Sequence, residues 1–75
     1  MSILVFMDIK FAENLKTLRK QENLSQTALA DKLHTTQRKV SHWESGKIEP
    51  DLSSLWTIAD FFDVTVDFLI GRNIL

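Results

Sequence analysis

The chain has no cysteine and very little glycine or proline, with two Gly and one Pro among its 75 residues. The absence of Cys excludes a disulfide scaffold, a zinc ribbon and a thiol nucleophile, and it fits a reducing compartment. So few Gly and Pro leave little room for long loops. A chain of this length forms one small domain, whose fold has to be held together by apolar packing alone.

Long hydrophobic runs are also missing. The longest apolar stretch, Ile3 to Met7, is far shorter than the ~20 residues needed to cross a bilayer, and it lacks the features of a signal peptide. We therefore expect no membrane partner and a cytoplasmic location. The stretch lies in an apolar N-terminal tail, residues 1–7. This tail would pack on its own domain, add a strand to a partner's tail or be disordered, and Met7 is a candidate natural start.

Neither sign of charge dominates, because the net charge is −1, but the charges are unevenly distributed. Residues 1–48 hold eight Lys and Arg against five Asp and Glu, a balance of +3. Residues 49–75 hold one Arg against five acidic residues, a balance of −4. The chain therefore has a basic front and an acidic back, which its overall pI of about 6.0 conceals.

Apolar residues recur at helical spacing between short polar breaks, and strict alternation is absent, so an all-α fold is expected. The first helix is predicted from Asp8 to Glu22, with Asp8 as its N-cap and Asn23 in a left-handed conformation after it. Gly46 and Gly71 are predicted to end the third and fifth helices. The side chains predicted to cap the second to fifth helices are Ser25, Thr36, Asp51 and Thr65.

The fourth predicted helix contains two kinds of apolar residue whose placement matters later. A shared inward face is predicted for Leu52, Leu55, Ala59 and Phe62, with Ile58 beside them. The two tryptophans, Trp43 and Trp56, occur at helical spacing with Leu and Ile, so both are predicted to be core residues.

Residues 26–45 predict two short helices that cross steeply, since only about three residues join them. Ala30 is small enough for the close approach, and Leu29, Leu33, Val40 and Trp43 are the apolar residues that would fix the crossing angle. The second of these helices then has an outward polar face, with Lys39 at its flank. Such a helix fits the major groove of DNA, where Gln pairs with adenine and Arg with guanine. The residues of this face are Gln37, Arg38, Ser41 and His42.

Two stretches resemble a known family. The first, residues 24–50, reads LSQTALADKLHTTQRKVSHWESGKIEP, and the second, residues 55–71, reads LWTIADFFDVTVDFLIG. Together they are similar to the lambda-repressor/Cro-like helix-turn-helix family over about residues 11–71. Members are compact five-helix DNA-binding domains of bacterial, phage or plasmid regulators, which bind operators as dimers. The resemblance thus implies a domain over residues 8–71, with the helix-turn-helix at helices two and three and a short tail at 72–75.

The resemblance also implies roles for single residues. Contacts to base edges are expected from Gln37, Arg38, Ser41 and His42. Contacts to phosphates are expected from Gln26, Thr36, Lys39, Ser45 and Lys47. Arg19 and Glu44 match a pair that forms a partly buried structural salt bridge, and Gln26 matches a residue that braces the recognition helix.

The sequence departs from the family's pattern in four places. His34 and Asp63 stand where Gly is common, Thr35 stands where an aliphatic residue is common, and Ser45 replaces a common Asn. His tolerates a left-handed conformation at some steric cost. The change at Ser45 weakens the case for one phosphate contact.

Apolar residues near the C-terminus exceed what a solitary core needs. Phe61 and Phe62 are adjacent, so one helix cannot turn both inward. We expect a self-association surface, although Phe61 is also explained if it only shields the edge of the core. The residues assigned to this surface are Phe61, Phe68, Ile70, Ile74 and Leu75.

No motif for catalysis is present: there is no nucleophile elbow, Gly-rich phosphate loop or carboxylate pair. His34 and His42 are interpreted as a turn residue and a groove residue, not as metal ligands. We therefore expect no enzyme activity, cofactor, metal or small-molecule substrate. The predicted function is sequence-specific transcriptional regulation, of the repressor type, by a homodimer bound to double-stranded DNA at a roughly palindromic operator. The alternative is a modulator, such as an antirepressor or antitoxin, that forms a heterodimer with another regulator.

Overall fold

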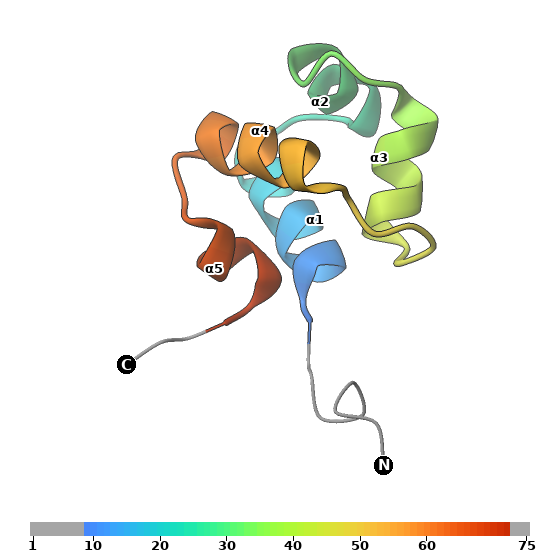
Figure 1. Ribbon diagram of the computed structural model, residues 1–75. Helices are drawn as coiled ribbons and strands as arrows, with labels where there is room; N and C mark the ends of the chain where they lie inside the picture. Colours follow the sequence, from blue (N-terminus) through green and yellow to red (C-terminus); the bar gives the residue numbers. More distant parts are fainter. Residues whose placement is uncertain (1–8, 73–75) are drawn as a thin grey trace.

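The computed structural model describes residues 9–72, which form helices joined by short turns and contain no strand (Figure 1). The all-α prediction is therefore confirmed. Helix α1 runs through the middle of the domain, α4 crosses it, α5 lies beside it, and α2 and α3 lie together on its other side (Figure 1). The five helices are α1 (Phe11–Gln21), α2 (Gln26–Lys32), α3 (Gln37–Glu44), α4 (Leu52–Phe62) and α5 (Val66–Ile70).

The four predicted capping residues are confirmed. Each hydroxyl or carboxylate oxygen accepts a hydrogen bond from the backbone N–H three residues later, at 2.8–3.1 Å. These bonds satisfy N–H groups that the first turn of a helix leaves without a partner. The caps are Ser25 for α2, Thr36 for α3, Asp51 for α4 and Thr65 for α5.

The breaks between helices use left-handed residues, as predicted for Asn23, Gly46 and Gly71. His34 and Asp63, which stand where the family commonly has Gly, also have positive φ, at 57° and 54°. Both residues thus take a left-handed conformation, at the steric cost that a Cβ atom carries there.

The predicted start of α1 is wrong. The helix begins at Phe11, and its N-cap is Lys10, whose side chain makes no capping hydrogen bond. Asp8, the expected cap, lies outside the described residues. The start of α1 is held by α5 instead: the Lys10 N–H donates to the carbonyl of Ile70 at 3.0 Å. A Cβ atom at Gly71 would come within 2.9 Å of the Lys10 side chain, so this close approach depends on Gly.

Every helix contributes one fully buried side chain to a single core: these are Leu15, Leu29, Val40, Ile58 and Leu69. Trp43 packs edge-on against Phe11, with ring centroids 6.4 Å apart. The predicted inward residues of α2 and α3 are buried as well, so the apolar lock between these helices is confirmed. Its members are Leu29, Ala30, Leu33, Val40 and Trp43.

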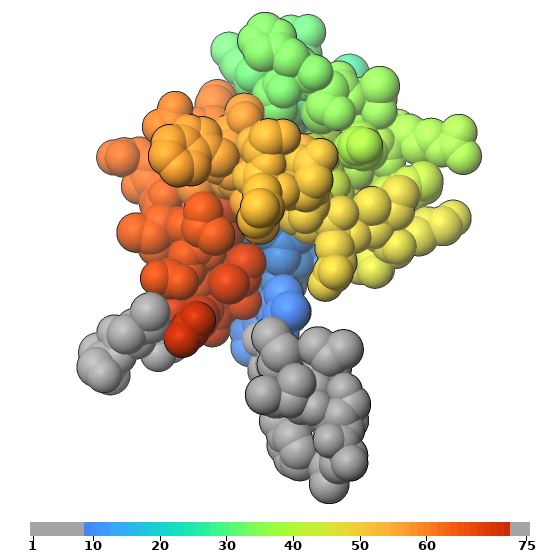
Figure 2. Space-filling view, in the orientation of Figure 1, coloured from blue at the N-terminus to red at the C-terminus, as the bar shows by residue number. Residues whose placement is uncertain are grey.

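The predicted inward positions of Leu52 and Trp56 are wrong, since these side chains are 84% and 76% exposed. The buried side of α4 is formed by Ile58 and Ala59, with Leu55 packed against the core. At about 100° per residue, Trp56 points roughly 110° away from the middle of that side. Leu52 is in the first turn, where no other helix covers it. The outward side of α4 forms the front surface of the domain in Figure 2.

A buried ion pair ties α1 to the end of α3. The Arg19 guanidinium donates from Nε to Oε2 of Glu44 at 2.6 Å and from Nη2 to Oε1 at 3.0 Å. Nη1 donates to the carbonyl of Leu24 at 2.7 Å. The two charged side chains are 10% and 4% exposed. The hydrogen bond to Glu44 raises the pKa of Arg19, and it outweighs burial, which lowers it.

Removing one member of this pair should destabilise the domain strongly, because the other charge is left buried without an opposite charge. We expect Glu44→Ala to lower the free energy of unfolding by about 3–5 kcal/mol, and the apolar double variant Arg19→Met/Glu44→Leu to lower it much less. Urea unfolding followed by circular dichroism measures both. Glu13→Ala is the control, since Glu13 pairs with Lys10 on the surface at 3.8 Å. Equal losses for the single and double variants would contradict this account.

The cap of α4 predicts a dependence of stability on pH. Hydrogen bonds from the Ser54 side chain and backbone N–H lower the pKa of Asp51 below its usual value. The ionised cap therefore stabilises the fold above the ordinary pKa of ~3.9, and this contribution is lost as pH falls through the lower folded-state pKa. Asp51→Ser keeps a cap that does not titrate. As the pH is lowered through the acidic range, its melting temperature should therefore fall less than that of the parent protein. Asp60→Ser should melt like the parent protein.

Candidate nucleic-acid interface

Capping and turn residues close in the sequence determine where α2 and α3 begin and how they are joined. The Ser25 and Thr36 hydroxyls start the two helices, and His34 turns the chain between them with its N–H bonded to the carbonyl of Asp31 at 3.2 Å. Ala30 is 3% exposed and lies where the helices approach. Because both helices bury their apolar sides in the shared core, the position of α3 is fixed relative to the rest of the domain.

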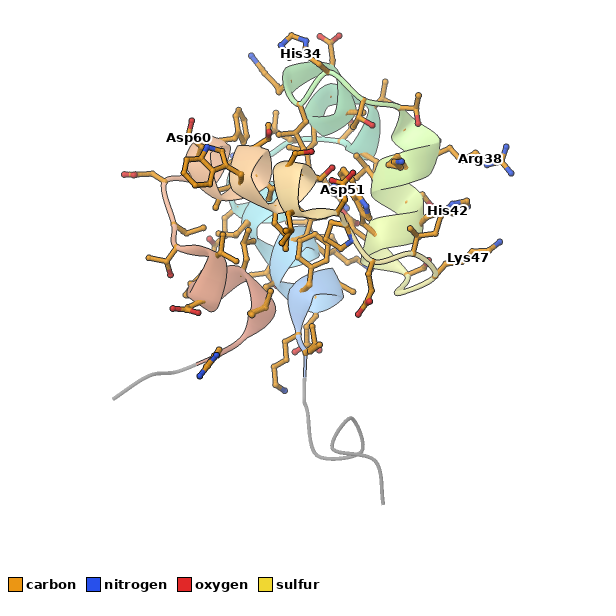
Figure 3. The ribbon with its side chains drawn as sticks, in the orientation of Figure 1. His34, Arg38, His42, Lys47, Asp51 and Asp60 are labelled. Atoms are coloured by element: carbon orange, nitrogen blue, oxygen red, sulfur yellow. The ribbon has the colours of Figure 1, made fainter. Side chains whose placement is uncertain are left out.

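The outward side of α3 carries the polar residues that the sequence predicted. Gln37, Arg38 and Lys39, at the start of the helix, are exposed, whereas Ser41 and His42 are half-buried. Arg38, His42 and Lys47 all project from the same side of α3 and the loop after it (Figure 3). The structure thus brings together the residues predicted to contact bases, and no other described helix covers them.

Gln26 and Gln37 are joined across the two helices. Nε2 of Gln37 donates to Oε1 of Gln26 at 2.8 Å, and Nε2 of Gln26 donates to Oε1 of Glu44 at 3.1 Å. Gln26 therefore holds the first residue of α3 against the ion pair. The sequence indicated that Gln26 braces α3, but it gave no sign of the bond to Glu44.

The loop after α3 holds two residues predicted to contact phosphate. Ser45 ends the helix, and its hydroxyl donates to the carbonyl of His42 at 3.2 Å. Gly46 follows with φ 77° and open space around it. The Lys47 N–H donates to the carbonyl of His42 at 2.9 Å, and its side chain is exposed. The loop is thus folded back on α3 and presents the Lys47 ammonium beside the polar face.

The remaining predicted phosphate contacts surround the start of α3. Gln26 is half-buried, while Thr36 and Lys39 are exposed. The Thr36 hydroxyl oxygen accepts the N–H of Lys39, which leaves its own O–H to donate elsewhere. Lys39 also lies near the start of α4, since it lines a surface hollow together with Ser53 and Ser54. Lys39 therefore lies at the boundary between the basic face and the acidic part of the chain.

The residues predicted for self-association are only partly described. Phe61 is 38% exposed, Phe68 is 52% exposed and Ile70 is half-buried, whereas Ile74 and Leu75 lie outside the described residues. Phe61 packs edge-on against Phe62, with ring centroids 4.9 Å apart.

The sequence analysis missed the outward stripe, which we define as Leu52 and Trp56, one turn apart on α4. A helical projection centred on Ile58 and Ala59 is the signal that could have found it, because it places Trp56 off the buried side.

The described part of the chain holds neither a metal-ligand cluster nor a membrane-spanning helix. Within residues 9–72 no three His, Cys, Asp or Glu side chains come together as metal ligands, and His34 and His42 lie on the turn and on the α3 face. The longest helices in residues 9–72, α1 and α4, have 11 residues each, too few to span a bilayer.

Comparison with known proteins identifies the family. A family model described as helix-turn-helix matches residues 15–69. The transcriptional activator BcrR of Enterococcus faecalis is 44% identical over 63 residues, which are 84% of this chain and 31% of that protein. This chain spans between 31% and 57% of the length of the curated relatives it matches.

Solved structures share the fold. A transcriptional regulator from Listeria innocua matches with a TM-score of 0.83 at 32% identity, over 91% of this chain and 64% of that one. The P22 c2 repressor, crystallised with a synthetic operator, matches with a TM-score of 0.78 at 22% identity, over 84% of this chain and 96% of that one. With the family model covering most of the chain, this protein belongs to the lambda-repressor/Cro-like helix-turn-helix family.

Proposed function

We propose that this chain regulates transcription by placing α3 in the major groove of double-stranded DNA. The observation that carries the proposal is the uncovered polar side of α3, whose first residues are exposed while its apolar side is buried in the core. An α-helix fits the major groove, and side chains at its start then reach the base edges. The relative crystallised with an operator, the P22 c2 repressor, has the same fold.

Sequence would be read by side chains with different hydrogen-bonding patterns. Arg38 has the donors that match the two acceptors of guanine, and Gln37 has the donor and acceptor that match adenine. Ser41 and His42 are half-buried one turn further along the helix and add polar groups to the same side. The basic pair at residues 38–39 favours a half-site that contains guanine.

Affinity would come mainly from phosphates on either side of the groove. Lys47 projects beside the polar face (Figure 3), and Lys39 is exposed in the first turn of α3. Gln26, Thr36 and Ser45 offer polar groups next to α3. Each phosphate that a Lys or Arg neutralises releases counterions, so binding should weaken steeply as salt rises. Bound at a promoter, the protein would act by blocking or recruiting the polymerase, without chemistry on DNA.

A homodimer would bring two copies of α3 into successive major grooves about 34 Å apart, on a roughly palindromic operator. The described residues of the proposed contact are Phe61 and Phe68, which are exposed, and Ile70, which is half-buried. Aromatic side chains are enriched in such contacts because they bury a large apolar area.

The second candidate function is that of a modulator which pairs with another regulator. The outward stripe on α4 favours it, because two large apolar side chains at 84% and 76% exposure mark a surface that a protein partner would cover. A purified protein that binds no DNA alone but co-purifies with a second regulator would establish this function in place of the first.

Arg38 and Lys47 should have separable effects on DNA binding. Sequences selected from random DNA would first give the operator. We expect Arg38→Ala to lose about 1–3 kcal/mol on the operator and to relax the preference at one base pair. Lys47→Ala should weaken operator and random DNA alike and reduce the salt slope by about one. Equal losses of both variants on both DNAs would refute these roles.

Self-association is tested by sedimentation at tens of micromolar protein. We expect a dimer for the parent protein and a monomer for Phe61→Glu, because a carboxylate cannot be buried in an apolar contact without a large cost. Thr27→Glu, which adds the same charge at an exposed position on α2, should remain dimeric. A monomeric parent protein unaffected by Phe61→Glu would rule out this surface. A dimer dissociated by Trp56→Glu but not by Phe61→Glu would move the contact to the outward stripe.

A further inference from the structure

A continuous chain of hydrogen bonds runs from the buried ion pair to the exposed start of α3. Arg19 donates to both oxygens of Glu44 at 2.6 and 3.0 Å. Oε1 of Glu44 also accepts from Nε2 of Gln26 at 3.1 Å, and Oε1 of Gln26 accepts from Nε2 of Gln37 at 2.8 Å. The two amide side chains therefore connect a buried charge to a residue proposed to read bases.

At the buried end of this hydrogen-bond network, Glu44 can only accept hydrogen bonds. A carboxylate paired with a guanidinium carries no hydrogen and can only accept, whereas an amide has a donor end and an acceptor end. Gln26 must turn its Nε2 toward Glu44, because the opposite orientation would set two oxygens against each other at about the same 3.1 Å. Because Nε2 of Gln26 donates to Glu44, Oε1 of Gln26 faces Gln37.

The same reasoning fixes Gln37. Facing an amide oxygen, it must turn its Nε2 toward Gln26, which leaves its Oε1 free together with the second N–H on Nε2. The groups presented outward are therefore one acceptor and one donor in a set order. In DNA, adenine offers the complementary pair in the major groove, N6–H and N7, whereas guanine offers two acceptors there and thymine one.

We propose that Glu44 is a specificity-determining positioning residue: through Gln26 it fixes which end of the Gln37 amide faces the DNA. This inference rests on the proposed function. Glu44 itself is 4% exposed and contacts no base, so it would act only through the two amides. The bond from Gln26 is not needed to satisfy the carboxylate, since Arg19 already donates to both of its oxygens.

Two variants interrupt the hydrogen-bond network at different points. Glu44→Gln replaces the carboxylate by a group that either donates or accepts, so Gln26 and then Gln37 are free to turn over. Gln26→Met removes the connection and leaves the ion pair in place, which keeps the test meaningful if the first variant does not fold. Gln21→Met, at an exposed position at the end of α1, is the matched control.

The readout is base preference, measured by selection from random DNA. Gln37→Ala first identifies the base pair that Gln37 reads. At that base pair we expect the parent protein and Gln21→Met to prefer adenine by about tenfold or more. Glu44→Gln and Gln26→Met should reduce this preference to about twofold while preferences at the other positions stay unchanged. A purely structural role of Glu44 would lower affinity at all positions alike.

The exchanged double variant Gln26→Glu/Glu44→Gln supplies a rescue. Residue 26 then carries the group that can only accept, so Gln37 must again turn its Nε2 toward it. We expect the adenine preference to return, even though the added carboxylate lowers overall affinity. Failure of the rescue in a folded protein that binds DNA counts against the proposal.

A measurement without DNA separates this inference from the proposed function. In the NMR spectrum of the free protein, one Nε2 proton of Gln37 should be shifted and protected from exchange, and Gln26→Met should abolish both effects. Side-chain protons of Gln37 that behave like those of Gln21 would overturn the inference whatever DNA is bound. An intact network in a protein that selects no sequence would overturn the proposed function, and with it the part of the inference that concerns DNA. Unchanged preference in both single variants would overturn the inference alone.

Discussion

The C-terminal end of α3 is held against α1 by the ion pair between Arg19 and Glu44. Helices of seven and eight residues, such as α2 and α3, are too short to be stable alone and take their stability from packing. Apolar contacts hold the middle of α3, but the pair fixes its end to α1 and, through the Leu24 carbonyl, to the segment before α2. A buried pair of this kind contributes little net stability compared with apolar residues. We interpret its role here as fixing one geometry of the polar face.

The features that the sequence predicted well are those set by neighbouring residues. Thr36 caps α3 through an N–H only three residues away, and His34 reverses the chain with a φ that depends on its own backbone. The apolar lock between α2 and α3 could also be predicted, because residues three and four apart in a helix lie on the same side of it. The outward position of Arg38 is simply the complement of the buried Val40 and Trp43.

The features that the sequence did not predict depend on distant contacts. The start of α1 is decided by the bond from Lys10 to Ile70, which lies 60 residues away in the chain. Trp56 is as apolar as Trp43, but Trp43 packs in the core against Phe11 of α1, whereas Trp56 lies off the buried side of α4. The link from Gln26 to Glu44 joins two residues with no pattern in common, so the orientation of the amides could be inferred only from their distances.

Net charge is a poor guide to DNA binding in a chain this small, because a phosphate backbone senses the local field. Arg38 and Lys47 project on one side of the domain, and Asp60 lies on the opposite side (Figure 3). Screening limits such fields to about 10 Å at 0.1 M salt, so charges on the far side barely weaken the basic face at contact. At longer range and low salt, the acidic residues repel the DNA backbone from the far side of the domain. They thereby orient the protein as it first meets the DNA. Acidic residues on α4 and α5 are thus compatible with the proposed role, and they favour approach of DNA to α3.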